Sequence, residues 1–290
     1  MRGPTPSAQP SVGDLPIRES GFTYLPRFFG AQETLDLAAY FAGLHPQWER
    51  RHAHGSAESG RRPGSLTRPV YWLGAWQFAA LGYYSEPEHV HHKCVAAEPI
   101  PDVLMSILQR LKPELQAHGD TRLPNTCLIN FYGQTCKAPG KPPVDMARLR
   151  MHRDGEPGPV IMLSVGQPAQ FEFVDPDVSE PVHSQWIRNR SAVILSGPEY
   201  KDRLYHRVTR VRYGDKPVLT ANVDDFQIRR VSISFRHVPP ERIHDFGALN
   251  AEARDVVRPY VEQLAQNSSH FRRQLLTESE ESRQFEWRPR

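Results

Sequence analysis

Hydrophobic residues follow two different periods along this chain, and the change falls near residue 124. In the first part, apolar residues at helical spacing predict a helix over residues 32–44. A stripe of leucine and isoleucine after Asp102 predicts a second helix, with Asp102 as its cap. Pro113 should kink or end that helix, because a proline ring interrupts the helical hydrogen bonding.

After residue 124, the apolar residues gather in short runs rich in β-branched and aromatic members and separated by Gly, Pro or Asp. These runs predict strands at 127–132, 160–165, 170–174, 192–196, 218–222 and 231–235. Many short strands at nearly regular spacing are typical of a sandwich or jelly roll. Polar stretches at 49–69 and 133–147 are expected to be loops, and residues 251–285 return to a helical pattern with mixed charge.

Composition narrows the class of protein without choosing a function. The chain has 290 residues, of which 39% are hydrophobic, enough to bury a core. Its formal net charge of +3 permits nucleic-acid binding but does not argue for it. Three cysteines without a C-x-x-C pair exclude a disulfide framework and favour a reducing, cytoplasmic setting. Residues 1–20 are expected to be a flexible arm rather than a signal peptide, and the most apolar stretch, 72–84, is too short and interrupted to span a membrane.

Two motifs far apart in the sequence carry candidate metal chemistry. His152 and Asp154 are two residues apart, so an extended backbone points both side chains to one face, and His206 follows after several predicted strands. Two neutral imidazoles and one carboxylate are the ligand set of a non-haem Fe(II) oxygenase, which leaves positions open for a 2-oxo acid and O₂. The alternative is chance, because H-x-D is a short motif and the chain has 13 histidines.

The last predicted strand has one apolar and one polar face. Residues 230–236 alternate, with Arg230 and Arg236 on the polar face and valine, isoleucine and phenylalanine on the other. Two arginines on one face suit an acidic co-substrate, whose carboxylate one can bind while the other braces the metal-ligating carboxylate. Asn130 and Tyr132 likewise share a face and can donate hydrogen bonds to a carboxylate. In each strand the alternative is a polar face turned to solvent.

Taken in order, these motifs resemble the AlkB family of Fe(II)- and 2-oxoglutarate-dependent dioxygenases. The matching residues are Asn130-Phe131-Tyr132, His152-Arg153-Asp154, a turn at Gly166, His206, and Arg230 to Arg236, within residues 22–238. The resemblance implies a mostly β fold with flanking helices, the double-stranded β-helix or jelly roll. Together with the sequence pattern outside the resemblance, this predicts four parts: a flexible arm at 1–20, N-terminal helices with a nucleotide-recognition lid at 21–120, the β-helix core at 121–240 and a helical extension of unknown role at 241–290.

By the same resemblance, the chain would demethylate N-alkylated bases such as 1-methyladenine and 3-methylcytosine in alkylated, single-stranded nucleic acid, as in the repair of damaged DNA. Fe(II), 2-oxoglutarate and O₂ would be required, and no catalytic residue is expected beyond the iron ligands. The iron ligands would be His152, Asp154 and His206. The residues that bind 2-oxoglutarate would be Asn130, Tyr132, Arg230 and Arg236. Contacts to the extruded base would come from two rings and one acid: Trp76, Tyr84 and Glu156.

Two features depart from the family pattern. The stretch between Tyr132 and His152 is long, which predicts an enlarged loop, and no basic substrate contact follows Phe173. Arg207, which flanks His206 with two further arginines, offers phosphate contacts near the expected mouth of the site. The departures leave two alternatives open. One is the same chemistry on a protein or a small molecule, and the other is a non-catalytic jelly-roll binding module.

Overall fold

The computed structural model describes most of the chain. The described residues are 15–46, 50–51, 64–65, 68–75, 77–78, 94–95, 97–120, 122–135, 142–145, 148–178, 180–212, 226–243 and 246–286. The strand predicted at 218–222 therefore lies outside them. Within the described residues, no helix is long and apolar enough to cross a membrane.

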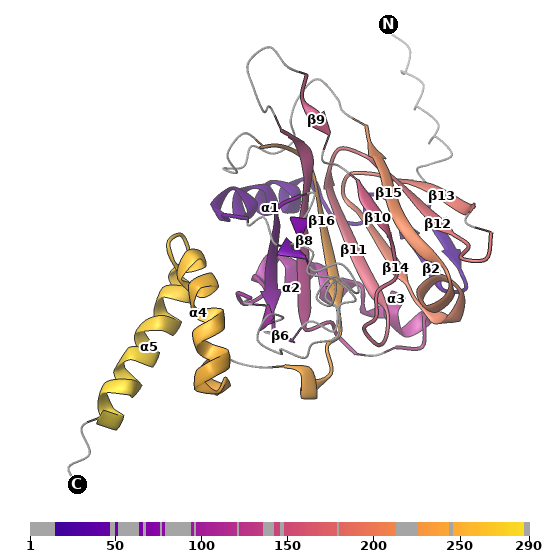
Figure 1. The fold of residues 1–290 in the computed structure, drawn as a ribbon. Helices are drawn as coiled ribbons and strands as arrows, with labels where there is room; N and C mark the ends of the chain where they lie inside the picture. The colour runs from indigo at the N-terminus through magenta and orange to yellow at the C-terminus, as the bar shows by residue number, and fades with distance from the viewer. Residues whose placement is uncertain are drawn as a thin grey trace, which may run out of the picture.

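Two antiparallel sheets face each other and form a curled half-barrel (Figure 1). The larger sheet has eight strands in the order β1-β2-β14-β11-β16-β8-β5, with β9 pairing to β8. Its strands are Ile17–Glu19 (β1), Phe22–Leu25 (β2), Val70–Gly74 (β5), Thr126–Thr135 (β8), Val144–Asp145 (β9), Val160–Gly166 (β11), Ser191–Leu195 (β14) and Phe226–Arg236 (β16). This arrangement is the jelly-roll form of the double-stranded β-helix, so the predicted fold class is confirmed.

The smaller sheet closes the other side of the half-barrel in the order β10-β15-β12-β13. Its strands are Leu149–His152 (β10), Ala169–Val174 (β12), Pro181–Ile187 (β13) and Tyr205–Val211 (β15). Two further sheets have two strands each: Arg50–Arg51 (β3) with Gly64–Ser65 (β4), and Gln77–Phe78 (β6) with Cys94–Val95 (β7).

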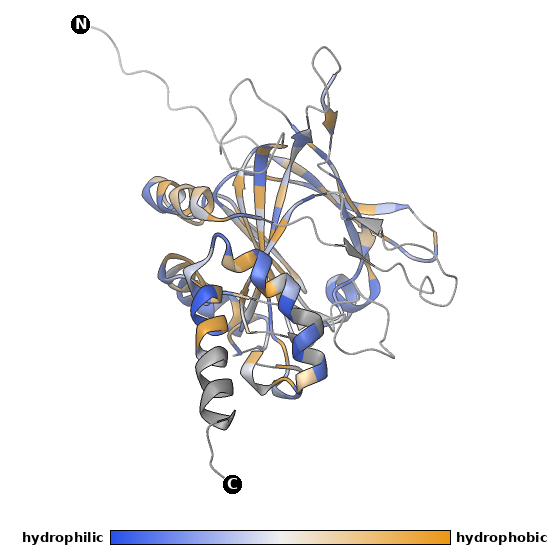
Figure 2. Ribbon diagram, turned by 60° about the vertical axis from the view of Figure 1, so that its left-hand side comes forward, coloured by the Kyte–Doolittle hydropathy of each residue, from blue (hydrophilic) through white to orange (hydrophobic). Residues whose placement is uncertain are grey.

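Helices cover the outer face of the larger sheet, so its central strands are buried on both sides. The helices on this face are Ala31–Gly43 (α1), Asp102–Arg110 (α2) and Lys112–Ala117 (α3). One apolar cluster joins α1 and α2 to that outer face, and a second fills the space between the two sheets. Burial on both faces explains the nearly uninterrupted apolar runs of β11 and β14. Figure 2 shows hydrophobic and hydrophilic residues along the strands of the sheets.

The two predicted N-terminal helices are present, but the expected cap of the second is wrong. Pro101, and not Asp102, precedes the first turn of α2, and its carbonyl oxygen accepts the backbone N–H groups of Leu104 and Met105. Asp102 is instead the first residue inside the helix, where a carboxylate favours the positive end of the helix dipole. As predicted, the helix breaks before Pro113, which lies in the first turn of α3.

Three expectations for the irregular segments need correction. Ile17–Glu19 pair with β2 instead of belonging to a flexible arm, and residues 1–14 lie outside the described part of the chain. The loop expected at 133–147 is shortened, because β8 continues to Thr135 and β9 pairs with its end. The loop expected at 49–69 contains β3 and β4.

The predicted helical C-terminal part consists of two helices, Ala251–Ala265 (α4) and Ser269–Glu286 (α5). Two short 3₁₀ turns, Pro240–Arg242 and Phe246–Ala248, lead into them from β16. Figure 1 shows α4 and α5 side by side at the edge of the molecule. Their buried side chains, including Val261 and Phe271, belong to the same apolar cluster as α1 and α2.

Candidate metal centre

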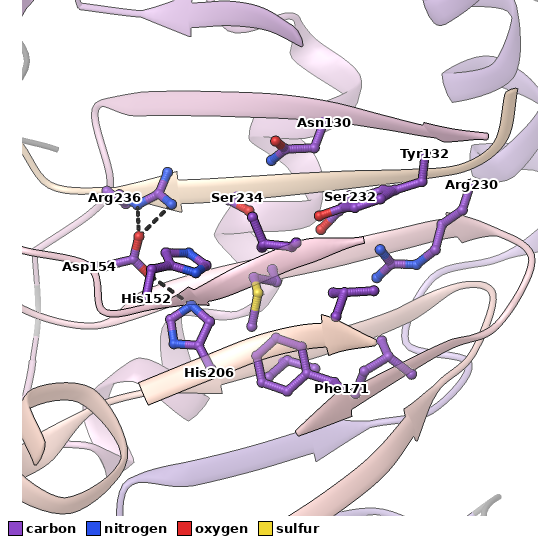
Figure 3. A pocket seen from close by; sticks show the side chains of 15 residues that line it. Asn130, Tyr132, His152, Asp154, Phe171, His206, Arg230, Ser232, Ser234 and Arg236 are labelled. Atoms are coloured by element: carbon purple, nitrogen blue, oxygen red, sulfur yellow. Dashed lines mark hydrogen bonds and ion pairs between the residues drawn. The ribbon is translucent and has the colours of Figure 1, made fainter. Parts of the chain in front are cut away.

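A pocket lies between the two sheets, and all seven residues predicted to bind metal or co-substrate line it. They are Asn130, Tyr132, His152, Asp154, His206, Arg230 and Arg236. The larger sheet supplies the polar faces of β8 and β16, and the smaller sheet supplies β10, β12 and β15. Figure 3 shows His152, Asp154, His206 and Arg236 at one end of this pocket and Arg230 at the other.

Strand pairing brings the three candidate metal ligands together. His152 ends β10 and lies opposite His206 in β15, and their ring centroids are 4.3 Å apart. Asp154 follows in the loop after β10, with its Oδ2 atom 3.4 Å from Nε2 of His206. One donor atom from each residue lies within 4.8 Å of the others. The cluster therefore offers two nitrogens and one oxygen on one side of a common centre, the arrangement of a facial triad.

The charge states of these side chains fit a divalent cation. Burial and the neighbouring His206 ring lower the pKa of His152 to about 3. Burial also lowers the pKa of His206 below its ordinary value. Burial alone would raise the pKa of Asp154, but the guanidinium of Arg236 outweighs it and holds that pKa well below its usual range. At neutral pH both imidazoles are therefore uncharged and the carboxylate is ionised, as metal ligands must be.

Local hydrogen bonds orient two of the candidate ligands and determine which of their atoms would bind a metal ion. Arg236 donates to Oδ1 of Asp154 from Nε at 2.8 Å and from Nη2 at 2.6 Å. Oδ2 of the same carboxylate is buried without a hydrogen-bond partner. His152 donates from Nδ1 to the carbonyl oxygen of Arg150 at 2.8 Å, which leaves Nε2 as its basic nitrogen. The residues present therefore fit a bound metal ion.

A π-helical turn, Gly197–Arg203, holds the loop that carries Asp154. The buried ammonium of Lys201 donates to the backbone carbonyl oxygen of Asp154 at 2.6 Å. From the other side, Arg153 donates to the carbonyl oxygen of Asp202 at 2.6 Å. These two reciprocal contacts fix the position of the loop against the turn, and π-helical turns are frequent at functional sites.

At the other end of the pocket, Arg230 is buried against Tyr132. Its guanidinium carbon lies 5.2 Å from the centroid of the Tyr132 ring, and Nε donates to Ser164 Oγ at 3.2 Å. Nη1 is buried without a hydrogen-bond partner, and burial lowers the pKa of Arg230. Gly166 allows the close approach of strands here, because its φ is +100° and a Cβ would lie 2.6 Å from the Arg229 carbonyl oxygen. An acidic group in the pocket would satisfy this guanidinium.

The predicted alternation of faces is confirmed in both strands, and the solvent-exposed alternative is wrong. Asn130 and Tyr132 are 3% and 1% exposed, and Arg230 and Arg236 are 3% and 2% exposed. The intervening apolar residues of β8 and β16 belong to the cluster beneath the helices. Every second side chain therefore points between the sheets, as the period of two requires.

The predicted substrate contacts are placed less completely. Trp76 and Tyr84 lie outside the described residues. Glu156 is 2% exposed, its carboxylate oxygens make no hydrogen bond, and its Oε2 lies 3.6 Å from Nε of Arg236. Burial raises the pKa of Glu156 to about 7, with Asp154 acting in the same direction and Arg236 opposing it.

The arginines beside His206 do not line the pocket mouth as expected. His206 and Val208 of β15 point between the sheets, so Arg207 lies on the outer face, where it pairs with Glu172 at 2.8 Å. Arg210 lies on the same outer face and donates to Gln170 at 2.7 Å. Their guanidinium groups are therefore turned away from the metal ligands.

Several residues that line or contact the site were not predicted from the sequence, among them one aromatic ring and two cations. Phe171 stacks on the His206 ring with centroids 5.3 Å apart, and its inward position follows from the alternation of β12. Lys201 contacts the metal end and Arg68 contacts Asn130, with Nε donating to Oδ1 at 2.8 Å. Neither belongs to a motif or a periodic pattern, so the sequence offers no signal for these two cations.

The chain was compared with protein families, curated proteins and solved structures. The matching family is described as the 2OG-Fe(II) oxygenase superfamily, and the match spans residues 21–236. A solved structure titled "The structure of OsALKBH1" is similar with 19% sequence identity and a TM-score of 0.48, covering 76% of this chain and 100% of that one. No curated protein matches. The family match contains the whole pocket lining and is the comparison that bears on function.

Proposed function

The chain belongs to the 2OG-Fe(II) oxygenase superfamily, and we propose that it oxidatively demethylates N-alkylated nucleic-acid bases of the 1-methyladenine and 3-methylcytosine type. It is an Fe(II)- and 2-oxoglutarate-dependent dioxygenase whose motifs are of the AlkB type. The observation that carries the proposal is that four motifs meet around one pocket: His152-Arg153-Asp154 (H-x-D), His206, Asn130-Phe131-Tyr132 (N-x-Y), and Arg230 with Arg236. The proposed substrate class follows from the resemblance of those motifs to the AlkB family.

The proposal gives each end of the pocket a separate task. His152, Asp154 and His206 would hold Fe(II) at one end. The metal would supply the oxidative chemistry: with O₂ and 2-oxoglutarate, which would leave as succinate and CO₂, the N-methyl group would be hydroxylated and then lost as formaldehyde, leaving the unmethylated base. The protein supplies ligands, orientation and a dry cavity for this chemistry.

The opposite end of the pocket and the wall that leads to it would orient the co-substrate. Arg230 has a buried, unpartnered Nη1 atom and would bind the far carboxylate of 2-oxoglutarate. Asn130 and Tyr132 supply neutral donors along the same wall. Arg236 keeps Asp154 ionised and fixed through two hydrogen bonds to Oδ1, so Oδ2 would be the atom that binds the metal.

Glu156 supports recognition of an alkylated base. Its carboxylate oxygens are buried beside the metal end without hydrogen bonds, so an exocyclic amine or a cationic base would satisfy them. A base must leave its stack to reach a pocket enclosed between two sheets, which costs least in a single strand. We therefore propose single-stranded nucleic acid as the partner, and a cytoplasmic location because the chain has only three cysteines and no C-x-x-C pair.

The test is mass spectrometry of a short single-stranded oligonucleotide that carries 1-methyladenine or 3-methylcytosine. It is incubated with protein, Fe(II), 2-oxoglutarate and ascorbate, beside the His152→Ala variant. His270→Ala is the matched control, because His270 lies in α5, outside the pocket lining. Loss of the methyl mass with the unmodified protein and with His270→Ala, but not with His152→Ala, is the expected result.

Two other outcomes separate the parts of the proposal. If succinate forms without demethylation, the oxygenase assignment stands and the base substrate is wrong, which directs the search to a protein or small-molecule substrate. If iron-loaded protein forms neither succinate nor product, a non-catalytic role becomes the better reading.

A further inference from the structure

Arg68 is a buried cation next to the co-substrate pocket, although it belongs to none of the motifs. It precedes β5 and is 2% exposed. Its Nε atom donates to Oδ1 of Asn130 at 2.8 Å, and its guanidinium carbon lies 5.3 Å from the centroid of the Tyr132 ring. It therefore contacts both residues of the N-x-Y motif at once.

The contact with Arg68 fixes which way the Asn130 amide points. The two ends of a carboxamide differ, since its oxygen only accepts hydrogen bonds and its nitrogen only donates them. Arginine has donors alone, so the atom that faces Arg68 must be the oxygen. Asn130 lines the pocket and Arg68 does not, so the NH₂ group is the end left for a ligand. A carboxylate or keto oxygen would accept a hydrogen bond from this NH₂ group.

Arg68 also adds a positive charge beside the end of the pocket that holds Arg230. Arg68 and Arg230 both lie close to the Tyr132 ring, at 5.3 and 5.2 Å from its centroid. Among the described residues, no carboxylate forms an ion pair with either of them. Nη2 of Arg68 and Nη1 of Arg230 are buried without hydrogen-bond partners. Two buried positive charges without an acid are costly, and a dianion in the pocket relieves that cost.

We infer that Arg68 is a positioning residue for the co-substrate: it orients the Asn130 amide toward the pocket and supplies, with Arg230, the second positive charge that selects a dicarboxylate. The inference rests on the use of 2-oxoglutarate by this superfamily and not on the proposed base substrate. Its test is therefore a binding measurement, which is independent of demethylation.

The experiment is calorimetric titration of Mn(II)-loaded protein with 2-oxoglutarate, without turnover. Arg68→Met removes both the positive charge and the N–H donors. Arg68→Lys keeps the charge but replaces the planar guanidinium with an ammonium group. Arg110→Met is the control, because Arg110 is an exposed arginine paired with Glu33. Loss of a charge-assisted contact should raise the Kd for 2-oxoglutarate roughly tenfold or more in Arg68→Met and by a smaller factor in Arg68→Lys. Arg110→Met should leave the Kd unchanged.

A second ligand separates positioning from a general structural role. 2-Oxopentanoate has the same chain length and 2-oxo acid group as 2-oxoglutarate but lacks the far carboxylate. Arg68→Met should weaken 2-oxoglutarate more than 2-oxopentanoate, so the preference for the dianion falls, while the Mn(II) affinity is unchanged. Equal weakening of both acids, or a parallel loss of Mn(II) affinity, would mean that Arg68 only supports the fold.

A double-mutant cycle tests the action through Asn130. If Arg68 orients the amide, Arg68→Met should cost less 2-oxoglutarate affinity in an Asn130→Ala background than in the unmodified protein. Additive losses would overturn the amide part of the inference. Failure of unmodified protein to bind 2-oxoglutarate at all would instead count against the co-substrate assignment, so the two failures are distinguishable.

Discussion

At the scale of single residues, two buried carboxylates and two buried cations lie together at the metal end of the pocket. Asp154 and Glu156 are 6% and 2% exposed, and the cations Arg236 and Lys201 are 2% and 7% exposed. Buried charges are tolerated when each has a partner and are costly when one partner is removed. Arg236 is the central member, because it contacts both carboxylates.

Replacing Arg236 tests this balance. Arg236→Leu leaves two buried carboxylates without their shared cation, so the free energy of unfolding should fall by about 3–5 kcal/mol in a denaturant titration. Arg210→Leu, on the exposed face of β15, should cost no more than about 1 kcal/mol. Adding Asp154→Asn to Arg236→Leu should recover part of the loss, because it removes the stranded charge. Additive losses in the double variant would show that the two side chains do not act as a pair.

At the scale of elements, His118 joins three segments that are distant in sequence. It follows α3 as its C-terminal cap, and its ring lies 2.8 Å from Oγ1 of Thr23 in β2 through Nε2. Nδ1 lies 2.7 Å from Oγ of Ser196, just after β14. Burial lowers the pKa of His118 below its ordinary value. The helix is therefore attached to the edge of the larger sheet by a neutral imidazole.

This attachment should make stability depend on pH in a defined direction. Because the pKa of His118 is lower in the folded state, the unfolded chain binds the extra proton first, and stability is lost as pH falls below about 6.5. His118→Gln cannot be protonated, and it should cost about 1–2 kcal/mol at neutral pH through weakened hydrogen bonds. Between about pH 7.5 and pH 5.5, the unmodified protein should lose more unfolding free energy than His118→Gln. Equal losses in the two proteins would exclude His118 as the source.

Strands differ in how well their sequence predicts them, and the difference has a physical cause. β11 and β14 are buried on both faces, so their apolar runs identify them. β15 was not predicted, because a bulge between Val208 and Val211 places these inward residues three positions apart and breaks the period of two. β13 was missed because most of its side chains are partly or fully exposed.

The same reasoning explains which site residues the sequence reveals. The predicted metal and co-substrate residues in or next to β8, β10, β15 and β16 belong to short sequence motifs, so they can be identified without coordinates. Arg68 and Lys201 act through contacts made across 62 and 47 residues, and nothing in their local sequence marks them as buried. Tertiary contacts alone distinguish these cations from the many arginines and lysines on the surface.

At the scale of the whole molecule, the C-terminal helices are built into the fold rather than appended to it. Val261, Leu264 and Phe271 are 0%, 5% and 1% exposed and belong to the cluster beneath α1 and α2. Ser268, between α4 and α5, donates a hydrogen bond to Glu98, which also accepts one from Tyr71 of β5 at 2.7 Å. An apolar contact and a polar contact therefore attach the helices to the sheet that carries Asn130 and Arg230.

Because of this shared core, a change in α5 should destabilise the β-helix as a unit. Phe271→Ala should lower the free energy of unfolding by about 3–5 kcal/mol, since it removes a fully buried ring. Leu276→Ala in the same helix is the matched control, because Leu276 is 62% exposed and its loss should cost less than about 1 kcal/mol. Denaturant unfolding followed by far-ultraviolet circular dichroism and by tryptophan fluorescence should give coincident transitions in both variants. A separate early loss of helical signal in Phe271→Ala, with the fluorescence transition unmoved, would show instead that α4 and α5 fold independently of the sheets that form the pocket.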